Sequence, residues 1–122
     1  MQDDRKSLGK WGEEQSCSFL EADGYRILRR NYKCRIGEID IIARKGEQLV
    51  FVEVKTRHSE YFESPKDAVT RKKQKFIIEA ANAYIEKYNI DKDARFDIIS
   101  IVIDSKVPTL EHIEEAFYSI IK

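Results

Sequence analysis

Three charged side chains lie where the surrounding sequence predicts buried strands. Asp40 stands among isoleucines, and Glu53 and Lys55 alternate with valines. Because residues two apart in a strand share a face, Glu53 and Lys55 point to the same side of the sheet. A pair of carboxylates can hold a divalent cation that binds a phosphate and activates a water, and a nearby lysine can stabilise the transition state. The pattern predicts metal-dependent phosphodiester hydrolysis; the alternative is edge-strand charges that prevent aggregation, with Lys55 paired to Glu53.

The turn between these two strands decides whether the two acids meet. A two-residue loop at residues 45–46 places Asp40 opposite Phe51, with Glu53 as its diagonal neighbour, and a four-residue loop at 45–48 places Asp40 directly opposite Glu53. A regular three-residue loop separates the carboxylates onto different faces, although a bulge can shift this count. Opposite Cβ atoms lie about 4.5–5.5 Å apart, close enough for two carboxylates to share one Mg²⁺. The chemistry therefore requires an even loop.

A helix predicted for residues 7–23 adds a third acid. Glu13 shares a face with Cys17 and Leu20 at helical spacing, whereas Glu14 falls on a polar face. Glu13 is therefore the acid directed toward the core or the site. The alternative is an ordinary first-turn acid that the helix dipole favours.

Basic residues gather in two runs, at residues 26–35 and 71–75. Lys73 begins the apolar stripe of a helix predicted for residues 70–88, where a lysine is unfavourable for the dipole unless a phosphate or a metal-bound anion lies nearby. The alternatives are solvated faces for both runs and a snorkelling Lys73. The candidates for contacts to nucleic-acid phosphates are Arg29, Arg30, Lys33, Arg35, Arg57, Lys72 and Lys73.

The composition fits one domain over residues 1–122, with 42% hydrophobic residues to form a core. A core of that size needs no disulfide, so Cys17 and Cys34 are expected to be buried thiols. No apolar run reaches the length of a membrane span and the first residues are polar, which predicts a cytoplasmic protein without a membrane partner. The 22 basic and 22 acidic residues give a net charge of zero, which does not by itself indicate a nucleic-acid binder.

Hydrophobic patterning predicts an α/β fold with the order α-β-β-β-α-β. The segment at residues 95–103 follows a helical crossover and should run parallel to the strand at 49–56, whereas the earlier strands join by a tight turn and should be antiparallel. Apolar residues on both faces of the strand at 49–56 predict helices on both sides of a mixed sheet. The tail, residues 110–121, fits a strand or a helix. The remaining predicted strands cover residues 25–30 and 38–44.

Four segments carry a resemblance to a known family. They are Gly-x-x-Gly-Glu at residues 9–13, Gly-Tyr-x-Ile-Leu-x-Arg-Asn-Tyr at 24–32, Gly-Glu-Ile-Asp-Ile-Ile-Ala at 37–43 and Phe-Val-Glu-Val-Lys-Thr-Arg at 51–57. The chain closely resembles the bacterial YraN family, and the likeness extends through residues 68–70, Lys73 and residues 95–97. That family is classed as predicted endonucleases of the PD-(D/E)XK, restriction-endonuclease-like superfamily, similar to archaeal-type Holliday-junction resolvases.

The resemblance implies a restriction-endonuclease-like core and assigns a catalytic role to Glu13, Asp40, Glu53 and Lys55. It also implies Mg²⁺ or Mn²⁺ bound by Asp40, Glu53 and Glu13, and a DNA substrate, for which branched or single-stranded DNA is the hypothesis. The resolvases suggest a symmetric homodimer. Candidates for the dimer face, which equally fit the core, are Tyr61, Phe62, Phe117, Tyr118, Ile120 and Ile121.

Three functional hypotheses follow from the sequence. The first is a Mg²⁺-dependent DNA endonuclease. The second, motivated by the zero net charge, is a nuclease-fold module without useful turnover that binds nucleic acid or a DNA-processing partner protein. The third is a metal-dependent hydrolase of RNA, because nothing in the sequence distinguishes RNA from DNA at the site.

Overall fold

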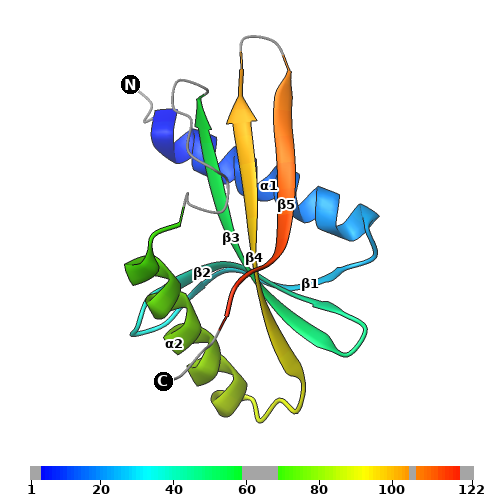
Figure 1. Ribbon diagram of the computed structural model, residues 1–122, viewed down its shortest axis with the longest axis vertical. Coiled ribbons are helices and arrows are strands. Elements are labelled where there is room, and N and C mark those ends of the chain that lie inside the picture. The colour runs from blue at the N-terminus through cyan, green and yellow to red at the C-terminus, as the bar shows by residue number, and fades with distance from the viewer. Residues whose placement is uncertain (1–3, 59–68, 105–106, 119–122) are drawn as a thin grey trace.

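The computed structural model describes residues 4–58, 69–104 and 107–118 (Figure 1). Its five strands form one sheet in the order β1-β2-β3-β4-β5. The elements are α1 (Asp4–Ala22), β1 (Arg26–Lys33), β2 (Glu38–Lys45), β3 (Gln48–His58), α2 (Arg71–Lys87), β4 (Asp93–Ile103) and β5 (Pro108–Phe117).

Both predicted helices are present, and local sequence signals mark the end of α1 and the start of α2. Helix α1 begins earlier than predicted and ends before Gly24, whose φ of +89° is a left-handed conformation that glycine adopts at little cost. Helix α2 is capped by Thr70, whose hydroxyl oxygen accepts a hydrogen bond from the backbone N–H of Lys73 at 3.1 Å. The cap fixes where α2 begins, beside Glu53 and Lys55 of β3.

The sheet is mixed, as predicted. Strand β3 runs parallel to β4, whereas the pairs β1–β2, β2–β3 and β4–β5 are antiparallel. The ambiguous tail forms a strand as far as Phe117, because β5 finds a hydrogen-bonding partner in β4 over most of its length; residues 119–121 of the tail lie outside the described residues. The fold therefore has the predicted element order with one more strand at the edge.

The β2–β3 hairpin has an even loop. Lys45 pairs with Gln48, so the loop consists of two residues, Gly46 and Glu47. Ile41 pairs with Val52, which is the register expected for a four-residue loop at 45–48. The observed two-residue loop gives the same register because it lies at 46–47, one residue later than the predicted two-residue loop at 45–46. Extending this register by one residue places Asp40 opposite Glu53.

The two faces of the sheet carry separate hydrophobic cores. Helix α1 crosses behind the strands in Figure 1 and packs Cys17 and Leu20 on one face, whereas α2 packs residues that include Ile77 and Tyr84 on the other. The prediction of helices on both faces is confirmed. Cys17 is buried, Cys34 is half-buried, and both are free thiols.

No helix in the described ranges is long and apolar enough to cross a membrane.

Candidate active site

Helix α1 reaches the site because glycine allows its backbone to lie directly on β3. A Cβ added at Gly12 would lie 1.9 Å from Oγ1 of Thr56, a separation that no side chain could adopt. A Cβ added at Gly9 would meet nothing within 4 Å. Gly12 therefore sets the close approach of α1 and brings its neighbour, Glu13, to the end of the β2–β3 pairing.

Asp40 lies where the pairing of β2 with β3 stops. The paired register ends at Ile41 and Val52, whereas β3 continues to pair with β4 as far as His58. Beyond that end, the backbone N–H of Val54 donates to Oδ2 of Asp40 at 2.9 Å. The carboxylate is thereby held at the free edge of β3, against the side chain of Glu53.

The surroundings of the two carboxyl groups raise the pKa of both. Burial, the charge of Glu53 and a hydrogen bond with Glu53 raise the pKa of Asp40 to about 7, although the bond from Val54 acts in the other direction. Burial also raises the pKa of Glu53, while the nearby charge of Lys73 opposes that rise. A divalent cation between the groups would remove this repulsion, which is the arrangement that the sequence pattern predicted.

A pocket of about 230 Å³ opens beside this pair, between β3 and the start of α2. Nζ of Lys73 lies 3.6 Å from Oε2 of Glu53, with 44% of the lysine side chain exposed and 12% of the glutamate side chain exposed. Oε1 of Glu53 is buried and meets no hydrogen-bond donor in the described part of the chain. The lining residues are Glu53, Lys55, Val69, Thr70 and Lys73.

Glu13 approaches Asp40 from the α1 side. Burial and the charge of Asp40 raise the pKa of Glu13, and a hydrogen bond with the side chain of Asn31 opposes the rise. Asn31, which the sequence reading missed, has a φ of +52° within β1, a conformation that asparagine tolerates better than most residues. Glu13 is half-buried and Glu14 is exposed, as the helical spacing of the sequence predicted for these two residues. Across the described residues, no three His, Cys, Asp or Glu side chains group closely enough to hold a metal ion by themselves.

Comparison with known proteins places these residues in a family. The model of the Uncharacterised protein family UPF0102 matches residues 12–101. The chain belongs to the UPF0102 family. Relatives named UPF0102 protein are 50% identical over 113 residues in Geobacter metallireducens (92% of this chain, 93% of the relative) and 44% identical over 115 residues in Phocaeicola vulgatus (94% and 95%). Another, in Clostridium perfringens, is 48% identical over 115 residues (92% and 94%).

The UPF0102 match spans all four residues of the predicted catalytic set and Lys73. The predicted resemblance to YraN-like proteins is thus confirmed for the family.

The first basic run of the UPF0102 chain does not form a single surface. The guanidinium of Arg29 lies 5.2 Å from the ring centroid of Tyr88 and 5.9 Å from that of Tyr84, on the α2 side. Arg30 lies on the α1 side, where its charge opposes the burial that raises the pKa of the Cys17 thiol. The other members of the predicted phosphate-binding set are exposed at Lys33, Arg35 and Lys72 and half-buried at Arg57 and Lys73.

A second buried acid of the UPF0102 chain escaped the sequence reading. Asp97 is fully buried on β4 and receives hydrogen bonds from Arg95 at 2.9 and 2.7 Å and from the backbone N–H of Glu115 at 3.1 Å. Nε2 of His112 lies 2.7 Å from the same carboxylate, and Arg95 also donates to the hydroxyl of Tyr25. The sequence did contain a signal for this cluster. Arg95 and Asp97 are two charged residues, two positions apart in an apolar strand, and this spacing places them on one face of the sheet.

Proposed function

We propose that this protein is a metal-dependent endonuclease that hydrolyses phosphodiester bonds in DNA. The observation that carries the proposal is the contact between the half-buried carboxyl groups of Asp40 and Glu53 at the free edge of β3. Two lysines, Lys55 and Lys73, border the adjoining pocket. Acids that repel each other next to cations suit a site that binds a metal ion and a phosphate together.

The residues present fit Mg²⁺ or Mn²⁺. Mg²⁺ is commonly bound by one or two carboxylates, with waters and substrate phosphates completing its shell. Asp40 and Glu53 would hold it, and the buried Oε1 of Glu53, which has no donor within the described residues, supplies a free acceptor. When bound, the ion supplies Lewis-acid activation for phosphodiester hydrolysis.

The side chains around the carboxylates have separate roles. Lys55 stabilises the negative charge that develops on the phosphoryl oxygens. Lys73 holds Glu53 through their ion pair and contributes positive charge to the pocket. Glu13 supports Asp40 from α1, and because burial and Asp40 both raise its pKa, it is suited to hold a proton beside the metal ligands.

Cleavage assays test this function directly. Branched, single-stranded and duplex DNA are incubated with the wild type and Mg²⁺ or Mn²⁺, and we expect cleavage of at least one substrate. Lys55→Ala and Asp40→Asn should each reduce the rate by about 100-fold or more, as loss of an electrostatic stabiliser does elsewhere. Lys87→Ala, which removes the same charge at the far end of α2, is the control. No cleavage by the wild type in any combination, or equal cleavage by Lys55→Ala, would contradict the proposal.

The net charge of zero favours a second candidate function, a nuclease-fold module that binds nucleic acid or a DNA-processing protein without turnover. In this case a partner, or a second copy of the chain, supplies positive surface that a single chain lacks. Titration calorimetry with Mg²⁺ separates the candidates. Binding of Mg²⁺ that Asp40→Asn abolishes supports the endonuclease, whereas no binding with or without DNA supports the module.

A further inference from the structure

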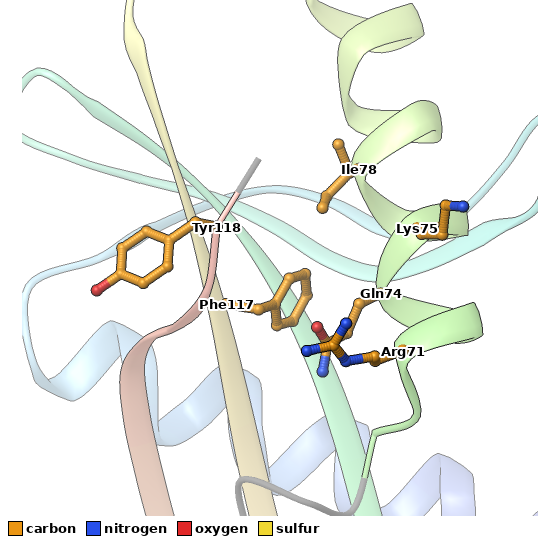
Figure 2. A pocket seen from close by; sticks show the side chains of 6 residues that line it. All are labelled: Arg71, Gln74, Lys75, Ile78, Phe117 and Tyr118. Carbon is orange, nitrogen blue, oxygen red and sulfur yellow. The ribbon is translucent and has the colours of Figure 1, made fainter. Parts of the chain in front are cut away.

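A second hollow lies on the other flank of α2, between that helix and the end of β5. It has a volume of about 530 Å³ and is lined by Arg71, Gln74, Lys75, Ile78, Phe117 and Tyr118. Figure 2 shows the side chain of Arg71 extending from α2 toward Phe117, whereas the ring of Tyr118 points away from α2. We refer to this hollow as the α2–β5 groove.

Within the described residues, the positive charge at the start of α2 is only partly compensated. Its first five residues contain four cations, and its first turn contains no acid. Lys73 pairs with Glu53, but no acidic side chain of the described ranges forms an ion pair with Arg71, Lys72 or Lys75. Cations at a helix N-terminus are opposed by the helix dipole and by one another. An external polyanion would offset both effects.

The floor of the groove is apolar. Phe117 is buried and stacks on Phe96 with ring centroids 5.3 Å apart, and Phe96 stacks on Phe51 at 5.6 Å. Ile78 packs against the same core from α2. A ligand that fits here carries negative charge for the rim and a flat apolar group for the floor, a combination that nucleotides have.

The groove and the candidate active site are lined by neighbouring residues of the same first turn of α2. Lys73 and Thr70 line the pocket beside Glu53, and Arg71 and Gln74 line the α2–β5 groove. A helical turn rises only about 5.4 Å, so a single nucleic-acid strand can contact both the pocket and the groove on the two sides of this turn. In duplex DNA the bases face inward and cannot reach a recessed floor, whereas an unpaired base exposes its flat face.

We infer that the α2–β5 groove binds unpaired nucleotides of single-stranded DNA that leads away from the cleaved bond. Arg71 and Lys75 contact phosphates, and a base packs over Phe117 and Ile78. The inference rests on the proposed function for the identity of the polymer, and it specifies that substrates have a single-stranded segment next to the reacting phosphate.

Binding in EDTA tests the groove without turnover. Fluorescence anisotropy is measured with a labelled 15-nucleotide oligo-dT and with a duplex of the same length, for the wild type, Arg71→Ala/Lys75→Ala and the control Lys87→Ala. Each lost phosphate contact should weaken oligo-dT binding by about tenfold at low salt. The slope of log K against log salt should fall by about 0.7 for each contact. Duplex binding should change far less, and Lys87→Ala should bind as the wild type does.

Three outcomes would overturn the inference: oligo-dT binding unchanged in the double variant, equal losses for oligo-dT and duplex, or displacement of oligo-dT by polyglutamate at equal charge concentration. The last would identify a surface for an acidic protein. Cleavage in Mg²⁺ is scored separately. A groove-dependent affinity without cleavage contradicts only the proposed function, and cleavage with an unchanged affinity contradicts only the groove.

Discussion

Two acidic clusters of this protein are withdrawn from solvent, and their surroundings shift the pKa of the carboxyl groups in opposite directions. Asp97 on β4 accepts hydrogen bonds from Arg95 and from a backbone N–H and lies against His112. Burial alone would raise the pKa of Asp97, but these contacts more than offset it and lower the pKa. Asp40 and Glu53 instead face each other, and the pKa of each is raised.

The difference in hydrogen-bond donors distinguishes a carboxylate that stabilises the fold from a pair of carboxyl groups suited to binding a cation. A buried carboxylate whose oxygens all meet donors joins the elements that supply those donors, here β4 and β5. Two half-buried carboxyl groups with one backbone donor and one lysine between them destabilise the fold in their ionised state. Such a pair next to an open pocket indicates binding of a cation, whereas the satisfied cluster does not.

The largest effect is expected from Asp97→Asn. This change replaces the buried charge partner of Arg95 by an amide and leaves a guanidinium that is only 8% exposed with the more distant carboxylate of Glu114 as its remaining partner. The free energy of unfolding, measured with urea, should fall by about 3–5 kcal/mol. Glu114→Gln removes a different carboxylate near Arg95, at 3.7 Å and 56% exposed, and should cost less than about 1 kcal/mol. Equal effects of the two changes would show that Asp97 does not join the strands.

A smaller loss is expected from Gly12→Ala, which tests how α1 is positioned at the acid pair. The new Cβ would overlap Oγ1 of Thr56, so unfolding should become easier by about 1–3 kcal/mol, and any cleavage activity should fall as Glu13 is displaced. Gly9→Ala meets nothing within 4 Å and should stabilise the helix by about 0.5–1 kcal/mol. Thermal denaturation of both variants gives the comparison. A stabilised Gly12→Ala protein would mean that α1 does not depend on this contact.

The change from aspartate to asparagine should have the opposite sign at Asp40. Asparagine can still accept from Val54 and can donate to Glu53, so it removes repulsion and keeps the contacts. The folded state raises the pKa of Asp40 from 3.8 to about 7, so it binds this proton more tightly than the unfolded state does. The free energy of unfolding therefore falls as pH rises from about 4 to about 7.

Metal-free Asp40→Asn should consequently gain on the order of 1 kcal/mol over the wild type at pH 8 and almost nothing at pH 4. Urea denaturation at both pH values measures this gain. Asp97 behaves conversely, because its stabilisation is present above its ordinary pKa of 3.8 and is lost only as the pH falls through its lowered value. If both asparagine variants lost stability at pH 8, the proposed contrast between the clusters would be wrong.

The smallest effect is the stabilisation by Mg²⁺ itself. Binding needs ionised carboxylates, so the rise in melting temperature on adding Mg²⁺ should be larger at pH 8 than at pH 5.5. At a concentration equal to Kd the gain is only about 0.4 kcal/mol. The Asp40→Asn protein should show no Mg²⁺-dependent shift, whereas Glu114→Gln should shift as the wild type does. A shift that is the same at both pH values would place the ion elsewhere.

Local sequence was sufficient for every element except the C-terminal strand β5, and for part of the site. The alternation of Val52, Glu53, Val54 and Lys55 predicted a strand with two charges on one face, and helical spacing separated Glu13 from Glu14. These inferences depend only on the fixed geometry of strands and helices. The position of the hairpin loop could not be read in the same way, because several loops fit residues 45–48 and only the paired register selects among them.

The sequence by itself determined which residues are chemically unusual: acids and a lysine inside apolar strands, glycines in a helix, and cations at the start of another. Tertiary structure decided which of them meet. It brought Lys73 to Glu53, placed Asn31 beside Glu13, and turned the ambiguous tail into the strand that carries His112 to Asp97. The physical reason is that local geometry depends on residues a few positions apart, whereas these contacts join distant segments through the packing of helices and strands.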